Sequence, residues 1–215
     1  MFISNGITYF RERDKGWGLV PAYEFVITFV VAFGLNLIPF LGPSNLLIAS
    51  TAAISLGNPD PATLIALGFI IALAASLAKS VHYMVTFFVS KHLSQKYQNR
   101  LDSEAVKIKP WAFLLLFLAA ATPIPDEPVV IPLGLMKYSP AKFFSAYFLG
   151  KVTIATAGAF LGSWIEVQFS GWFSQDALIV LSIILTVVIT ILMFKVDVGK
   201  LLNKIFKRGY SAKKA

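Results

Sequence analysis

Long uncharged runs alternate with short charged segments along this chain of 215 residues. The first uncharged run covers residues 25–59 and is interrupted by Pro39, Gly42 and Pro43. Because proline removes a backbone donor and clashes with the preceding turn, a helix stops there. Each half, 25–38 and 44–57, would be about 21 Å long, shorter than a hydrocarbon core of about 30 Å. We therefore predict a re-entrant hairpin over residues 25–57, entering and leaving a membrane on one side.

A second uncharged stretch has the same form. Residues 111–122 and 129–136 would make helices of about 18 Å and 12 Å, with the segment PIPDEP between them. We predict a second re-entrant hairpin over residues 111–136, whose tip holds the adjacent carboxylates of Asp126 and Glu127. The prolines of this tip are Pro123, Pro125 and Pro128.

Three other segments, residues 61–90, 140–165 and 177–194, are long enough to be full spans. Asp60 and Ser139 precede the first two, each followed by a proline, as an N-cap and a first helical residue would be. The order is hairpin, span, basic loop, hairpin, span, span, so one unit occurs twice. Each unit of hairpin plus span crosses the membrane once, so the second unit must have the opposite orientation to the first. We predict an all-α integral membrane protein: an inverted repeat of re-entrant hairpin plus transmembrane helix, with an extra C-terminal transmembrane helix.

Composition agrees with a membrane protein. Hydrophobic residues make up 57% of the chain and charged residues 14%, against roughly 25% charged in average globular proteins. Cysteine is absent, which excludes disulfides, thiolate nucleophiles and cysteine metal sites. Neither a metal-ligand spacing nor a phosphate-loop motif occurs, so we expect no enzyme, no metal site and no cofactor. We divide the chain into an interfacial segment 1–24, one membrane domain 25–196 and a basic tail 197–215.

Basic residues indicate the orientation. Of the 19 lysines and arginines, seven lie between Lys91 and Lys142 and seven from Lys195 onward, all on one side of the predicted topology. By the positive-inside rule this side is the cytoplasm, and the protein lies in the inner or plasma membrane as a multi-pass protein. The basic tail follows a span and has no interleaved aromatic residues, so we expect attraction to anionic lipid rather than nucleic acid.

Charged residues inside uncharged surroundings are the candidates for function. An ionised group in hydrocarbon is costly, and it usually faces a cavity or a partner. Two adjacent carboxylates, Asp126 and Glu127, exceed what one helix cap needs, although one of them could serve only as a cap. Lys151 lies about 14 Å into its span. It is a candidate counter-ion, a headgroup contact, or half of a static ion pair.

Other polar residues carry two interpretations each. Lys79 and His82 share a helix face; for Lys79 we favour snorkelling to the cytoplasmic interface, and His82 is either a proton relay or a packing residue. We place Asn36, Ser44 and Asn45 of the first tip on the substrate or proton pathway. A stripe of small residues favours close helix packing, including a homodimer contact. They are Gly150, Ala157, Gly158 and Gly162.

The phrases PFLGPSNLLIAS and PIPDEPVVIPLGLMKYSPAKFFSAYFLGKV resemble the two tips of the DedA/VTT family, also called SNARE-associated membrane proteins. The resemblance covers roughly residues 22–164. It implies movement or scrambling of lipids or lipid-phosphate carriers, often with proton coupling. Two arginines of the family's second tip are replaced here by Thr122 and Pro128, and the first tip has amide and hydroxyl side chains instead of acidic ones. The small multidrug export family, with an acidic second tip, is a related alternative.

These observations predict a membrane lipid transporter, flippase or scramblase for phospholipid or polyprenyl-phosphate-type lipids, with proton coupling. Half-helix N-termini after Pro43 and Pro128 would face an anionic headgroup. The acidic pair would hold or exchange a proton, and Lys151 would set its charge balance. The alternatives are a proton-coupled exporter of small amphipathic cations and a non-transporting scaffold, which would tolerate neutral residues at the acidic tip.

Overall fold

The fold was analysed in a computed structural model, which describes residues 22–39, 42–57, 59–123, 125–174, 176–184 and 188. Within these residues the chain is helical and contains no strand, so the predicted all-α class is confirmed. The helices are α2 (Ala22–Asn36), α3 (Asn45–Leu56), α4 (Pro61–Ser90), α5 (Gln95–Ile108), α6 (Ala112–Ala120), α7 (Glu127–Leu135) and α8 (Pro140–Phe169).

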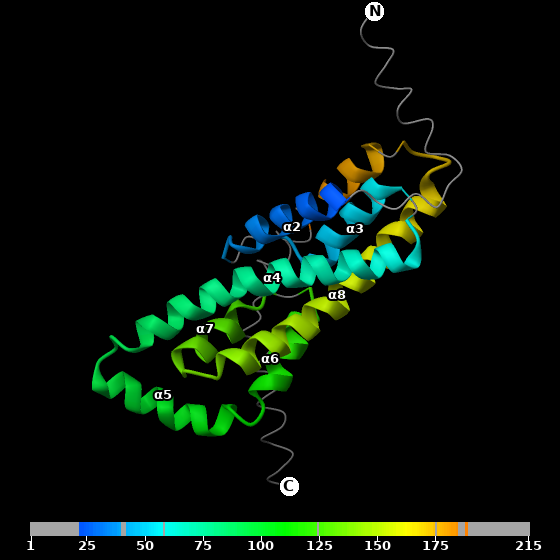
Figure 1. Cartoon of the computed structure of the whole chain (residues 1–215). Helices are drawn as coiled ribbons and strands as arrows, with labels where there is room; N and C mark the ends of the chain where they lie inside the picture. Colours follow the sequence, from blue (N-terminus) through cyan, green and yellow to red (C-terminus); the bar gives the residue numbers. More distant parts are fainter. Residues whose placement is uncertain are drawn as a thin grey trace, which may run out of the picture.

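The two 30-residue helices, α4 and α8, form an antiparallel pair at the centre of the molecule (Figure 1). Near one end a Cβ on Gly68 would overlap Thr156. Near the other end the ring of Tyr83 stacks on Phe143, with 4.3 Å between the ring centroids. From the first of these contacts to the second, residue numbers rise along α4 and fall along α8, so the two helices run antiparallel.

Two helix breaks fall where proline and glycine predict them. One lies between α2 and α3 and the other between α6 and α7, and every predicted half-helix ends within three residues of an observed end. At the first break a Cβ on Gly42 would come within 2.8 Å of the carbonyl oxygen of Leu35. This tight return past the end of α2 therefore requires a glycine.

Each broken pair packs across both long helices. Helix α2 packs on α4 and α3 on α8, whereas α6 packs on α8 and α7 on α4. Two separate apolar cores result, one around α2 and α3 and one around α6 and α7. They lie toward opposite ends of the α4–α8 pair (Figure 1).

Glycines of α8 allow these contacts. A Cβ on Gly158 or Gly162 would overlap the backbone of α3, and the hydroxyl of Ser50 donates to the Gly158 carbonyl over 2.7 Å. A Cβ on Gly150 would come within 2.6 Å of the Phe117 carbonyl oxygen on α6. Close packing was predicted for these glycines, and it occurs within the chain. Only Ala157 of the predicted stripe is exposed, while the homodimer contact stays a prediction.

The two predicted caps behave differently. Asp60 accepts hydrogen bonds from the backbone N–H groups of Ala62 and Thr63 over 2.9 and 3.1 Å and from the Thr63 hydroxyl over 2.6 Å. The Thr63 hydroxyl, and then its N–H, hold the pKa of the Asp60 carboxyl below its usual range. Ser139 stands at the N-cap position of α8, but its side chain forms no cap hydrogen bond.

The predicted basic loop is mostly helical, because residues 95–108 form α5. Leu101, Ala105 and Ile108 recur at helical spacing and are among its more buried residues, whereas charged side chains occupy much of the rest. This amphipathic pattern is typical of a helix lying along a surface.

Exposed apolar residues occur along most of α4. An exposed apolar residue stands at every fourth position over about 36 Å of helix, compared with a hydrocarbon core of about 30 Å. Both α4 and α8 are long and apolar enough to cross a membrane. The exposed residues of this α4 stripe are Ile65, Phe69, Leu73, Leu77, Val81, Val85 and Val89.

Three predicted segments near the two ends of the chain lie partly or wholly outside the residues that the structure describes. Of the predicted span 177–194, residues 177–184 and 188 are helical and the others lie outside the described residues. The segment 1–24 is described only from residue 22, and the tail 197–215 lies outside.

Candidate functional site

Four charged side chains meet at the second helix break. Asp126 immediately precedes α7, Glu127 is its first residue, and Lys79 and Lys151 lie on α4 and α8. Lys79 is the nineteenth residue of α4 and Lys151 the twelfth of α8. Because the helices are antiparallel and equally long, both lysines lie at one level, about 5 Å from the middle of each helix. All four side chains are only 6% exposed.

Direct ion pairs connect the four groups. The Lys151 ammonium lies 2.9 Å from Asp126 Oδ2, and the Lys79 ammonium lies 3.3 Å from Asp126 Oδ1. Lys79 also donates to Glu127 Oε1. Two carboxylates and two ammonium groups thus form one formally neutral cluster, which we call the charge cluster. Mutual pairing offsets part of the cost of removing these groups from water.

Tyr147 completes the charge cluster. Its hydroxyl donates to Asp126 Oδ2 over 2.5 Å, and Lys151 Nζ lies 5.0 Å from the centre of its ring. This residue was not among the predicted candidates. Tyr147 precedes Lys151 by four positions on α8 and so shares its face; that spacing was the available signal.

Asp126 does not act as the cap that was weighed against a functional role. Asp126 stands at the N-cap position of α7, but its side chain makes no cap hydrogen bond. Its two oxygens instead form ion pairs with Lys79 and Lys151, and one of them accepts a hydrogen bond from Tyr147. The counter-ion contact proposed for Lys151 is therefore present in the structure, whereas capping is not the role of the Asp126 side chain.

The snorkelling interpretation of Lys79 is wrong. Its side chain turns into the protein and bridges both carboxylates. Distance along a helix predicts how deeply a residue lies, but not which neighbour covers its face. Helix α7 packs on α4. The Lys79 ammonium therefore lies much closer to the carboxylates of the second break than to the water beyond the end of α4.

The polar residues of the first break form a second group. The side-chain amides of Asn36 and Asn45 exchange two hydrogen bonds of 3.0 Å, and Asn36 also donates to the Ala32 carbonyl over 2.8 Å. The Ser44 hydroxyl is buried and has no hydrogen-bond partner among the described residues. The amide pair thus connects α2 and α3 across the first break. These side chains are uncharged, whereas those at the second break are charged.

His82 connects α4 to this first break. Its Nε2 lies 3.0 Å from the Leu37 carbonyl, while its Nδ1 is buried without a hydrogen-bond partner in the described part of the chain. Lys79 lies three residues earlier on the same helix and belongs to the charge cluster. One turn of α4 therefore contacts both breaks. Among the described residues, no group of three or more potential ligands could hold a metal ion.

The predicted tip residues differ in surroundings. Pro39, Pro123 and Pro128 are exposed, whereas Pro43 and Pro125 are partly buried. Pro128 occupies the first turn of α7, where the absence of an N–H group costs nothing. The prolines thus shape the breaks and leave the polar contacts to other side chains.

A family model, that of the VTT domain, matches residues 20–164 of this chain. The matched stretch contains both helix breaks, nearly all of both long helices and all five residues of the charge cluster. No curated protein and no solved structure matches the chain.

Proposed function

Because this chain belongs to the VTT-domain or DedA family, we propose that it moves lipids from one leaflet of a membrane to the other. The family is a membrane family often linked to lipid transport and generally non-enzymatic. One observation supports the proposal above others: a neutral charge cluster of two carboxylates and two lysines, buried at a helix break midway along the long helices. Phospholipids and polyprenyl-phosphate-type lipids are the proposed substrates.

We propose further that the two broken helix pairs are re-entrant hairpins of an inverted repeat. The exchange of packing partners supports this, since each pair contacts its own long helix with its first half and the other long helix with its second half. The breaks would then approach the membrane midplane from opposite sides, as in secondary transporters. We place the assembly in the inner or plasma membrane with α5 in the cytoplasm.

The mechanism follows from the neutrality of the charge cluster. An anionic headgroup that enters it adds a negative charge, and the entry costs least when a carboxylate takes up a proton at the same time. Protonated Glu127 releases Lys79, which can then bind a phosphate oxygen. When the headgroup leaves, Glu127 loses the proton and pairs with Lys79 again. One proton thus accompanies each negative charge of the substrate.

A cation exporter fits the same residues less well. Asp126 already pairs with two lysines and Glu127 with Lys79, so an incoming cation would have to displace a buried ammonium group. A headgroup anion needs only protonation of one carboxylate. The scaffold alternative makes the opposite prediction, because a scaffold would keep its role without any charge in the cluster.

The experiment must keep the charge cluster neutral. Exchanging both carboxylates for amides would leave two buried lysines unpaired and would confuse loss of transport with loss of fold. The combined variant Lys79→Met with Glu127→Gln removes one charge of each sign. We expect it to remain folded and to move fluorescent phospholipid in reconstituted vesicles at least about tenfold more slowly than the unmodified protein does, which corresponds to about 1.4 kcal/mol in the barrier.

The matched control removes one charge of each sign from the surface. Lys96 and Asp102 are exposed on α5, so Lys96→Gln with Asp102→Asn should leave lipid movement within about twofold of the unmodified rate. If the cluster variant moves lipid as fast as this control does, the charge cluster does not carry transport and the scaffold interpretation gains support.

A further inference from the structure

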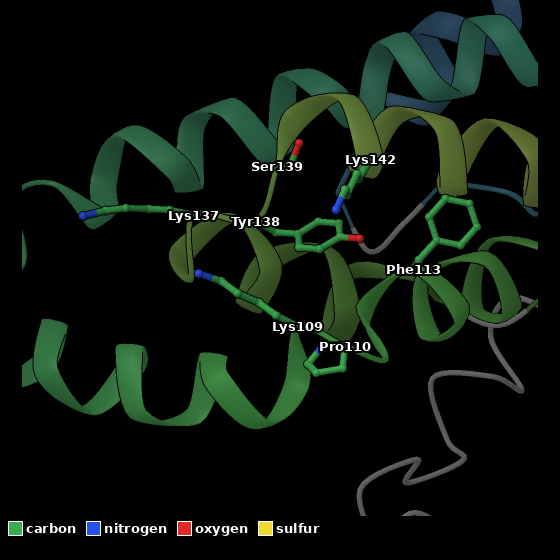
Figure 2. A pocket seen from close by; sticks show the side chains of 7 residues that line it. All are labelled: Lys109, Pro110, Phe113, Lys137, Tyr138, Ser139 and Lys142. Carbon is green, nitrogen blue, oxygen red and sulfur yellow. The ribbon is translucent and has the colours of Figure 1, made fainter.

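A pocket of about 630 Å³ opens at the end of the molecule where α5 ends and α8 begins (Figure 2). Its volume lies within the roughly 300–1,000 Å³ that is typical of small-molecule sites. No residue of the charge cluster lines it. The lining residues are Lys109, Pro110, Phe113, Lys137, Tyr138, Ser139 and Lys142.

Three lysines give this pocket a strong positive charge. Lys109 follows α5, Lys137 lies in the turn after α7, and Lys142 lies in the first turn of α8. All three are exposed, and none forms a salt bridge within the described part of the chain. Like charges held near one another repel, and a bound anion relieves that repulsion. Figure 2 shows Lys142 and Lys109 on opposite sides of the Tyr138 ring, with Lys137 extending outward.

The start of α8 adds to the same potential. The first N–H groups of a helix have no partner inside it, and Ser139 forms no cap hydrogen bond to them. This end of a helix carries a partial positive charge that favours anions. The backbone and the three lysines therefore act in the same direction on one small volume.

The turn before α8 fixes the backbone of Lys137. Lys137 has φ of 51°, a left-handed conformation that is uncommon outside glycine. Two backbone hydrogen bonds of 3.0 Å, from Lys137 to Gly134 and from Tyr138 to Leu133, hold this turn closed. The pocket thus combines lysine charge with a rigid turn.

The other half of the pocket is apolar. Pro110, Phe113 and the ring of Tyr138 line it beside the lysines. Exposed apolar side chains continue from there along α6, among them Leu114 and Leu118. A ligand with a charged head and an apolar body matches this division, whereas a small hydrophilic anion would use only half of the pocket.

We propose that this lysine pocket binds the phosphate of a membrane lipid headgroup, with the acyl chains against the exposed face of α6. Ammonium groups and free helix N–H groups bind phosphate oxygens. The pocket lies at the end of the long helices, at the level where headgroups meet water in the proposed orientation. Such binding does not require that the lipid cross the membrane, so it stands apart from the transport proposed for the charge cluster.

Direct binding measurements test the proposal. The detergent-solubilised full chain is titrated with short-chain phosphatidic acid, with diacylglycerol of the same chain length and with inorganic phosphate. We expect saturable binding of phosphatidic acid that is at least about tenfold tighter than binding of either other compound. Lys109→Gln with Lys142→Gln should weaken phosphatidic acid binding about tenfold or more, and Lys109→Arg with Lys142→Arg should restore most of it, since arginine also binds phosphate.

The control removes two lysines from the same end of the molecule but outside the pocket. Lys91 and Lys96 are exposed and do not line it, so their exchange for glutamine should change phosphatidic acid binding by less than about twofold. Equal losses in both lysine pairs would show a general charge effect and overturn the site. Equally tight binding of inorganic phosphate, or of diacylglycerol, would overturn the lipid-phosphate assignment. The variant Lys79→Met with Glu127→Gln should keep the part of the phosphatidic acid binding that Lys109→Gln with Lys142→Gln removes, which separates this site from transport.

Discussion

Lys79 holds the second helix break to α4 through two carboxylates at once. Its ammonium contacts Glu127 directly and lies 3.3 Å from Asp126, whereas Lys151 lies 2.9 Å from Asp126 alone. Removing Lys79 would leave a single lysine for two buried carboxylates. A buried charge without a partner is strongly destabilising, while the loss of a whole buried pair is close to neutral.

This asymmetry predicts the outcome of a double-mutant cycle. Lys79→Met alone should lower the free energy of unfolding by about 3–5 kcal/mol. Adding Glu127→Gln should recover most of that loss, because the stranded charge is then gone. Thermal or denaturant unfolding in detergent measures all four corners of the cycle. Lys91→Met, at the exposed end of α4, serves as the control and should have little effect. Simple additivity of the two changes would contradict a coupling between Lys79 and Glu127.

The charge cluster was only partly predictable from the sequence. Asp126, Glu127 and Lys151 stand out because they are charged residues within long, otherwise uncharged segments. Their depth in the membrane follows from the number of residues between them and the ends of those segments. Lys79 was misinterpreted because a helix position says nothing about which neighbouring helix covers it. Tyr147 was missed because a tyrosine in an apolar segment is common; only its contact with Asp126 distinguishes it.

At the scale of elements, local chemistry predicts where helices end but not how they pair. Proline and glycine placed both breaks correctly, since their effect is confined to one turn. The helix α5 was not predicted, because its segment was interpreted by charge alone. The exchange of packing partners between the two broken pairs depends on contacts far apart in sequence, such as that of Ser50 with Gly158.

Packing of α3 on α8 depends on two glycines with backbone atoms directly above them. Gly158→Leu would force its side chain into the backbone of Leu46, and overpacking typically costs about 1–3 kcal/mol. We expect a clear fall in the melting temperature of the purified protein. Ala157→Leu, on the exposed side of the same turn, should leave it nearly unchanged. Equal effects of both variants would mean that α3 is not held against Gly158.

At the scale of the whole molecule, apolar side chains cover much of the outside and charged side chains lie in the interior, which is the reverse of the usual arrangement in a protein in water. The outward stripe of α4 is apolar over its length, whereas four charged side chains lie buried between the helices. The three pocket lysines stand at one end, beyond the apolar surface of α6. A membrane normal close to the α4–α8 axis satisfies all three features, and the lysine-rich end should then face the cytoplasm.

That orientation predicts which ends of the molecule are accessible from outside the cell. The chain has no cysteine, so a single introduced cysteine reports one position. Helix α5 follows the end of α4, and Gly171 follows the end of the antiparallel α8. A membrane-impermeant maleimide should label the Gly171→Cys variant in intact cells, and the Asn99→Cys variant only after the membrane is opened. Ala157→Cys, exposed but midway along α8, should resist labelling in both conditions because lipid covers it. Labelling of Gly171→Cys and Asn99→Cys from the same side would show that the α4–α8 pair does not span the membrane. A clean reversal would instead leave the span intact and overturn only the orientation inferred from the lysines.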